Sequence, residues 1–243
     1  YISSLTNKNK STLYHHYKKL IGKKNKDVEL NFSDTDFIGE LIGLFVGDGY
    51  LFYNKKNGTY STRLFFNNSE NEYVKKIEEL FEEKLKKKPR INRVKNVLVV
   101  RYYSKKLFEF IEDYSGWGIS RNKRGYNKKS RTVFLKNKKF CKEFKKGFLR
   151  GFIDSDGYLS DEKIIFSSAS RKIMEQTKQF LLDLNFEKIS LNFYKEKRIN
   201  RVGMWHLYLY KSERENFIEN IRPRNKTSIK YAPAGIRISE SEK

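Results

Sequence analysis

The stretch that decides the fold is FLRGFIDSDGYL, residues 148 to 159, which places two aspartates among aromatic, aliphatic and glycine residues. A second stretch, ELIGLFVGDGYL at residues 40 to 51, aligns with it without a gap at an offset of 108 residues, so that Asp48 aligns with Asp156. Self-similarity of this kind indicates a duplicated unit. The sequence therefore predicts two related halves in one chain.

Small residues recur at every fourth position around both stretches: Gly39, Gly43 and Gly47 in the first, and Gly147, Gly151 and Ser155 in the second. Residues four apart lie on one face of a helix. Glycine inside a helix costs roughly 0.5 to 1 kcal/mol relative to alanine, and close approach of two helix backbones would compensate for that cost. We therefore predict two central helices, each stopped by a glycine of positive φ, Gly49 or Gly157, which bring Asp48 and Asp156 side by side.

The elements that follow each motif also repeat. In the first half we expect strands at 50–55 and 59–68, a helix at 70–86, a hairpin at 90–103 turning at Lys95-Asn96, and a helix near 105–114. In the second half we expect strands at 158–160 and 163–168, a helix at 170–184 and a hairpin at 189–210. The fold class is then α+β, with two pseudo-symmetric αββαββα repeats, at 34–135 and 136–243, after a basic helical segment at 1–33.

The charge of the chain indicates its partner. With 52 basic and 29 acidic residues the formal net charge is +23, and such a surface gains by releasing the counterions condensed on nucleic acid. An anionic membrane is the competing partner, but neither an apolar run long enough to span a bilayer nor a signal peptide stands out. We expect a soluble, intracellular protein of the cytoplasm or an organelle, with no membrane association.

Cysteine and histidine usage limits the metal chemistry. Cys141 is the single cysteine, so an internal disulfide and a thiolate zinc cluster are excluded. His15, His16 and His206 do not have the spacing of zinc ligands. A metal in this chain would be a hard cation held by carboxylates.

The motif LRGFIDSDG, residues 149 to 157, resembles the nine-residue LAGLIDADG motif, and LIGLFVGDG at 41 to 49 is a looser copy. The chain resembles a single-chain, two-motif LAGLIDADG homing endonuclease of the intron-encoded, archaeal-like kind, over about residues 34 to 235. The resemblance implies a monomer, needing no protein partner, whose sheets form a saddle on double-stranded DNA. It implies cleavage of both strands at a long asymmetric site, which leaves short 3′ overhangs.

The resemblance also implies the roles of the site residues. Asp48 and Asp156 would bind an essential Mg²⁺ (or Mn²⁺) ion, together with the backbone carbonyls of Gly47 and Ser155. Lys123 and Lys226, each in an Arg-Asn-Lys tripeptide, would polarise the attacking water or stabilise the phosphate, although both could be solvated charges. The first copy has Val46 where the motif has its earlier aspartate, so Asp154 in the second copy is expected to be structural.

The outer faces of the sheets are expected to read the major groove. Candidate contacts are Arg63, Asn67, Arg93, Arg101, Lys163, Asn192, Tyr194, Arg198, Arg201, His206 and Tyr208, with Leu64, Phe66, Phe193, Leu207 and Leu209 facing the core. Any of the candidates could touch only phosphate. An error of one residue in register would reverse a face.

Two further readings stay open. On the same scaffold the chain could be a catalytically silent RNA maturase or DNA-binding regulator; an intein endonuclease predicts a starting Cys or Ser and a terminal His-Asn, which this chain lacks. The N-terminal segment has Leu13, Tyr17 and Leu20 at helical spacing, which fits either a simple amphipathic helix or half of a helix-turn-helix motif. We expect it to be an accessory DNA contact.

Overall fold

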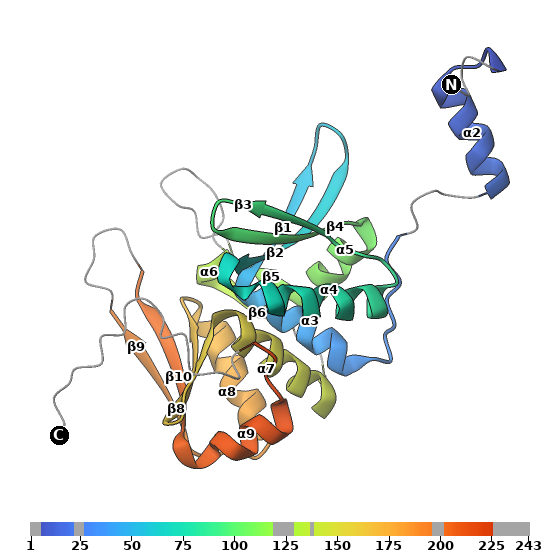
Figure 1. The fold of residues 1–243 in the computed structure, drawn as a ribbon. Coiled ribbons are helices and arrows are strands. Elements are labelled where there is room, and N and C mark those ends of the chain that lie inside the picture. The colour runs from blue at the N-terminus through green and yellow to red at the C-terminus, as the bar shows by residue number, and fades with distance from the viewer. Residues whose placement is uncertain (1–5, 22–26, 119–128, 137–138, 196–201, 226–243) are drawn as a thin grey trace.

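The computed structural model describes residues 6–21, 27–118, 129–136, 139–195 and 202–225. Two long helices lie side by side at the centre, with one four-stranded antiparallel sheet on either side of the pair (Figure 1). The two sheets have the same strand order, so the predicted pseudo-symmetric α+β fold is confirmed.

The first sheet has the order β1-β2-β4-β3. The elements of this half are α3 (Thr35–Asp48), β1 (Gly49–Asn54), β2 (Thr59–Asn67), the 3-10 helix η1 (Asn68–Glu70), α4 (Asn71–Leu85), β3 (Arg90–Val94), β4 (Val97–Tyr103) and α5 (Lys105–Tyr114). The predicted two-residue turn joins β3 to β4, with Lys95 at a φ of 54°. Side-chain caps start two of the helices: Asp34 accepts from the backbone N–H of Phe37, and Ser104 from that of Leu107.

The second sheet has the order β7-β8-β10-β9. The elements of this half are α7 (Lys142–Asp156), β7 (Gly157–Leu159), β8 (Lys163–Ser168), α8 (Arg171–Asp183), β9 (Ile189–Tyr194), β10 (Met204–Tyr210), the 3-10 helix η2 (Lys211–Glu213) and α9 (Arg214–Ile221). Residues 196–201, where we expect the turn of the hairpin at 189–210, lie outside the described residues. The end of the first half adds three elements that we did not predict: β5 (Ser115–Trp117), α6 (Lys129–Thr132) and β6 (Val133–Leu135), where β5 pairs with β6.

The central helices meet through their glycine faces, as predicted. A Cβ added at Gly39 would overlap the carbonyl oxygen of Phe144, and one added at Gly151 would overlap that of Glu40. The backbones of α3 and α7 therefore touch, and only glycine fits at these positions. Large apolar side chains flank the contact and fill one continuous core, in which Phe45, Phe148 and Phe152 are at most 1% exposed.

The expected positive φ at the two motif glycines is wrong. Gly49 has φ −90° and ψ 155°, and Gly157 has φ −102° and ψ 171°, so both are extended and begin a strand directly. Glycine is required for another reason: a Cβ at Gly49 would overlap Phe45, and a Cβ at Gly157 would overlap Ile153. Each helix thus turns into its sheet without an intervening loop.

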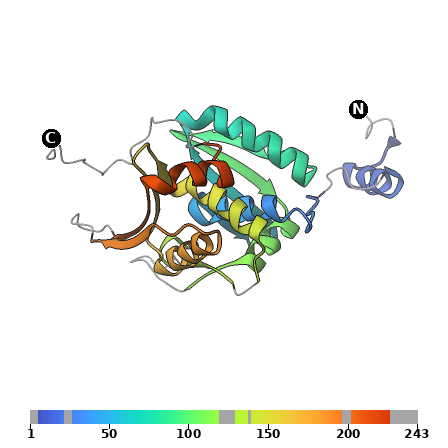
Figure 2. The same cartoon turned by 90° about the horizontal axis from the view of Figure 1, so that it is seen from below.

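One helix stands away from the rest of the fold. α2 (Lys10–Ile21) lies apart from both sheets in the two perpendicular views (Figure 2). Asn9 caps it by accepting from the N–H of Thr12, and Leu20 is 85% exposed. The expected helix is therefore present, and its described apolar side chains, such as Leu13 and Leu20, do not join the core.

Among the described residues, no helix combines the length and the apolar composition needed to cross a bilayer.

Candidate functional site

The two motif aspartates end the paired helices next to one another. Asp48 is the last residue of α3 and Asp156 the last residue of α7. A Cβ added at Gly47 would lie 3.4 Å from the Cγ of Asp156, which shows how closely the two helix ends approach. A helix C-terminus carries partial negative charge, and neither α3 nor α7 has a basic residue in its last turn. Two carboxylates and two helix C-termini thus bring negative charge together, and a cation bound here would offset it.

Lys129 supplies one positive charge to this place. Its Nζ donates hydrogen bonds to the carbonyl oxygens of Phe45, Val46 and Gly47, at 2.5, 2.8 and 3.1 Å. These belong to the last turn of α3, whose carbonyls lack partners within the helix. Burial lowers the pKa of Lys129 to about 8, while the charges of Asp156 and Asp48 oppose that shift. Both aspartates thus act on the same ammonium group.

The donor set at the helix ends suits a hard divalent cation. The described part of the chain offers the Asp48 and Asp156 carboxylates here, and no cluster of three or more His, Cys, Asp or Glu side chains occurs in it. Mg²⁺ commonly takes one or two protein carboxylates and completes its shell with water and phosphate oxygens. The side chain of Ser155 is engaged elsewhere, because its Oγ donates to the carbonyls of Gly151 and Phe152. Its main chain would therefore be the ligand, as we expect for Gly47, whose carbonyl oxygen accepts from Lys129 with one of its two lone pairs.

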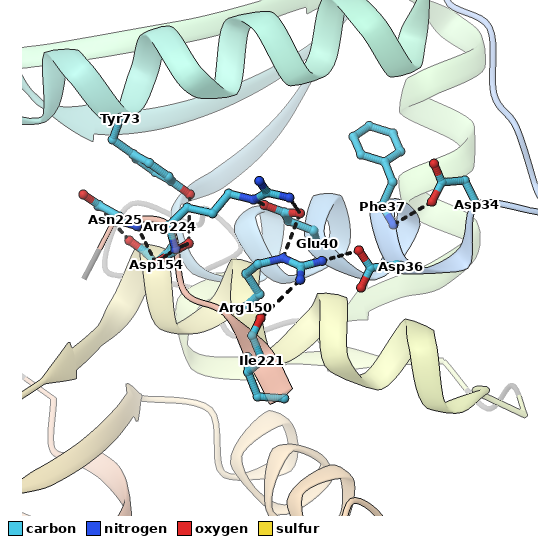
Figure 3. A network of polar contacts seen from close by, with 10 residues as sticks. All are labelled: Asp34, Asp36, Phe37, Glu40, Tyr73, Arg150, Asp154, Ile221, Arg224 and Asn225. Atoms are coloured by element: carbon cyan, nitrogen blue, oxygen red, sulfur yellow. Dashed lines mark hydrogen bonds and ion pairs between the residues drawn. The ribbon is translucent and has the colours of Figure 1, made fainter. Parts of the chain in front are cut away.

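The earlier aspartate of the second motif is structural in this fold. Asp154 is fully buried and accepts hydrogen bonds from the backbone N–H groups of Arg224 and Asn225, at 2.8 and 2.9 Å (Figure 3). It also accepts from the Tyr73 hydroxyl at 3.4 Å. Burial, reinforced by the charge of Asp154, raises the pKa of Tyr73 well above its ordinary value, which keeps this hydroxyl a donor. Asp154 therefore fastens the chain after α9 to α4.

An ionic network centred on the buried side chains of Glu40 and Arg150 extends from this point along the helix pair (Figure 3). Glu40 of α3 accepts from Arg150 of α7 at 3.0 Å and from Arg224 at 2.7 Å, and Arg150 also pairs with Asp36. Arg150 completes its bonds with the carbonyl of Ile221 at 3.2 Å. The network therefore links α3 of the first half to α7 and to the segment that follows α9 in the second half.

The first sheet turns a cationic and aromatic face outward. Cross-strand partners lie on the same face of a sheet, and Arg63 is opposite Arg101, which is opposite Arg90. Arg63 stacks on Phe52 at 4.9 Å, and Arg90 stacks on Tyr103 at 5.4 Å. Arg63 and Arg101 thus lie where we expected them, and Arg90 was not anticipated.

The second sheet turns a mostly neutral polar face outward. Asn192 is opposite His206, and the Tyr208 hydroxyl donates to that of Tyr194 at 3.1 Å. His206 is within 3.0 Å of the Ser167 hydroxyl, and burial lowers its pKa. Lys163, opposite Tyr210, shares this face. The five described candidates of this sheet therefore share one surface.

One face assignment and one burial prediction were wrong. Arg93 is opposite Leu98, which is buried against the helices, so Arg93 lies on the face away from Arg63. Phe193 shares the face of Leu207 but extends past the end of the core beside Trp205, and is 51% exposed. The other expected core residues, Leu64, Phe66, Leu207 and Leu209, are buried.

Other expected site residues have local roles or lie outside the described residues. Asn67 ends β2, where its side chain accepts from the N–H of Ser69 in a capping box with Glu70. Its side chain thus has a local structural role. Lys123, Lys226, Arg198 and Arg201 lie outside the described residues.

The residues that the sequence analysis missed differ in the signal they left. Arg90 could have been found by counting outward from the turn at Lys95-Asn96, which sets it opposite Arg101. Arg150 is a charge within the buried stretch of α7 from Gly147 to Ile153, a pattern that requires a buried partner such as Glu40. Lys129 left no signal, because its segment shows no periodicity.

Comparison with known proteins agrees with this geometry. Residues 143–222 match the family model of the LAGLIDADG-like domain. An uncharacterised protein of Methanocaldococcus jannaschii, MJ0398, is 26% identical over 210 residues, which cover 84% of this chain and 69% of that protein. The replication factor C small subunit of the same organism is 26% identical over 199 residues, 78% of this chain and 10% of that protein's length.

A solved structure has the same fold. A variant of I-DmoI, in complex with its target DNA in the presence of magnesium, superposes with a TM-score of 0.56 at 15% identity. The match covers 80% of this chain and 99% of that one. I-DmoI is a homing endonuclease. The resemblance stated from the two motifs is confirmed, and the fold is that of the LAGLIDADG homing endonucleases.

Proposed function

We propose that this chain, with its LAGLIDADG-like second half, is a site-specific endonuclease that cuts both strands of DNA at a long asymmetric site. One observation carries the proposal: Asp48 and Asp156 end two helices that touch, and both act on Lys129. Carboxylates collected at two negative helix ends are costly unless cations join them. A metal-dependent phosphodiesterase makes use of that arrangement.

The metal would be Mg²⁺ or Mn²⁺. Asp48 and Asp156 would hold it with the main-chain carbonyls of Gly47 and Ser155. When bound, such an ion supplies a hydroxide nucleophile and stabilises the leaving 3′ oxygen. I-DmoI has been crystallised with DNA in the presence of magnesium and with DNA and manganese, which supports this choice for a chain of the same fold.

Lys129 enters the proposal beside the two expected lysines. By holding three carbonyls at the end of α3 it orients the backbone that carries Asp48, so we assign it a positioning role. Lys123 and Lys226 keep their proposed roles, which are to polarise the attacking water and to stabilise the phosphate. Lys129 acts through the helix end, whereas these two would act on the reacting groups.

The outer faces of the two sheets would bind double-stranded DNA, one half-site each. Because both halves belong to one chain, we propose that the protein acts as a monomer. We also propose that its cleavage leaves short 3′ overhangs. Residues 34–135 and 136–243 are then the two recognition units, preceded by the accessory segment 1–33. The net charge of +23 supports a polyanionic partner.

The test is a cleavage selection with matched variants. The protein is incubated with a randomised duplex library plus magnesium, the cut ends are sequenced, and the recovered site is used for rates. Asp48→Asn and Asp156→Asn should lower cleavage by about 100-fold or more, because an amide neither holds the metal nor balances its charge. Both should bind the site as the parent does. Asp161→Asn, an exposed aspartate paired with Arg214, is the control and should cut at the parent rate.

Two results would contradict the proposal. A parent protein that binds its selected duplex but leaves it intact with magnesium or manganese would be a silent binding protein. An Asp156→Asn variant that cuts both strands at the parent rate would place the nuclease centre elsewhere.

A further inference from the structure

The outer face of the first sheet concentrates positive charge in one row. Tyr50, Arg63, Arg101 and Arg90 are successive cross-strand partners on β1, β2, β4 and β3. Three arginines thus stand on neighbouring strands, which are about 4.8 Å apart. Like charges directly opposite one another destabilise a sheet. Such a row calls for a partner that accepts hydrogen bonds.

Among the described residues, no carboxylate pairs with Arg63, Arg90 or Arg101. Aromatic rings hold the guanidinium groups instead: Phe52 lies under Arg63, and Tyr103 contacts Arg90 and Arg101. Arg101 donates to the Tyr103 hydroxyl at 3.0 Å, while its buried Nε has no hydrogen-bond partner. Burial and the charge of Arg101 lower the pKa of Arg63. The aromatic rings thus hold the three guanidinium groups in place, while the Nε of Arg101 lacks a hydrogen-bond acceptor among the described residues.

The corresponding row of the second sheet has different chemistry. Tyr50 and Tyr158 both follow their motif glycine, so the row equivalent to that of Tyr50 runs through Tyr158, Ile165, Tyr208 and Ser190. It contains no charged side chain, and Ile165 is 1% exposed. The two equivalent rows therefore present three arginines in the first sheet and none in the second.

From this difference we propose that the arginine row reads guanines in the major groove, in the half-site bound by the first sheet. The proposal rests on the proposed function. Guanine is the base whose major-groove edge offers two adjacent acceptors, N7 and O6, and an arginine fork matches them bidentately. A side chain that only donates gains less from adenine, which presents a donor beside its N7.

The position of the row favours bases over phosphates. Arg63 and Arg101 stand on the two inner strands of the sheet, where an inserted β-ribbon meets the floor of the groove. The stacked rings limit the guanidinium groups to a few orientations, and this gives geometric specificity that a phosphate contact does not need. The described outer face of the second sheet would recognise its half-site through amide, hydroxyl and imidazole groups together with the Lys163 ammonium.

The experiment is a binding selection from randomised duplexes, without cleavage, on the full chain and three variants. The parent should recover sites with a short guanine cluster in one half. Arg101→Gln and Arg63→Gln should each lower the preference for guanine by about tenfold or more at one position, with adenine gaining there, because glutamine pairs with adenine N6 and N7. Arg93→Gln removes an equal charge from the opposite face of the same sheet. It should leave the preference at every position unchanged.

Other outcomes would overturn the inference. If Arg101→Gln weakens binding to all duplexes equally and lowers the salt slope by about one, the row contacts phosphates. If the parent binds tightly to duplexes that have no guanine in either half-site, the arginine row does not recognise guanine. That result would leave the nuclease proposal standing. A parent that binds no duplex would overturn both.

Discussion

The guanidinium of Arg150 donates from Nε to Glu40 at 3.0 Å between the paired helices, with Glu40 only 1% exposed. Arg224 approaches the other oxygen of the same carboxylate at 2.7 Å. A buried carboxylate with two arginine partners is stable only while the set is complete, since breaking a buried pair leaves an uncompensated charge.

Glu40→Leu should lower the free energy of unfolding by about 3 to 5 kcal/mol, because two arginines then lose their shared partner. The double variant Glu40→Leu with Arg150→Met should be less damaging than the sum of the two single changes. Urea denaturation of the four proteins measures both. Strict additivity would show that the pair is not coupled.

The glycine contact of the helix pair can be tested with one methyl group. Gly43→Ala should destabilise the protein by several kcal/mol or prevent folding, because the new Cβ would overlap the Phe148 carbonyl. Gly118→Ala is the control: in the described part of the chain its Cβ would meet only Thr132, at 3.7 Å, so a change within about 0.5 kcal/mol is expected. Equal melting of both variants would contradict the close approach.

Stability should fall on acidification through His206. Burial lowers its pKa in the folded state, so between that pKa and the unfolded value of about 6.5 the unfolded chain binds more protons. The free energy of unfolding therefore decreases as the pH drops below about 6.5. His206→Gln should show a shallower decrease in urea titrations from about pH 7.5 to 5. His16→Gln, on exposed α2, should retain the dependence of the parent; identical curves for all three would exclude His206 as its source.

The N-terminal helix should add affinity for DNA without adding stability. α2 stands apart from the body, so a chain beginning at residue 27 should melt like the parent. It should bind DNA more weakly and with a smaller salt slope, since fewer basic side chains displace counterions. Fluorescence titrations over a range of salt concentrations compare the two chains. Unchanged affinity and slope would remove α2 as a contact.

The parts of the fold that could be predicted follow from local and repeated patterns. The four-residue glycine spacing indicated the helix contact, and the turn at Lys95-Asn96 set the register of β3 and β4. The position of Lys129 depends on how a distant segment returns to the end of α3, which no periodicity encodes. The conformation of Gly49 was mispredicted because a steric clash with Phe45, and not a turn, makes glycine necessary.

The tie between Arg224 and Glu40 also has a consequence for biosynthesis. The first half leaves the ribosome carrying Glu40 and the apolar face of α3, while α7 and Arg224 are still to be translated. Until α7 and Arg224 emerge, the Glu40 carboxylate lacks both arginine partners and the apolar face of α3 stays exposed. The nascent first half is therefore incomplete and prone to aggregation. Separately expressed halves should for the same reason be poorly soluble alone and recover when produced together.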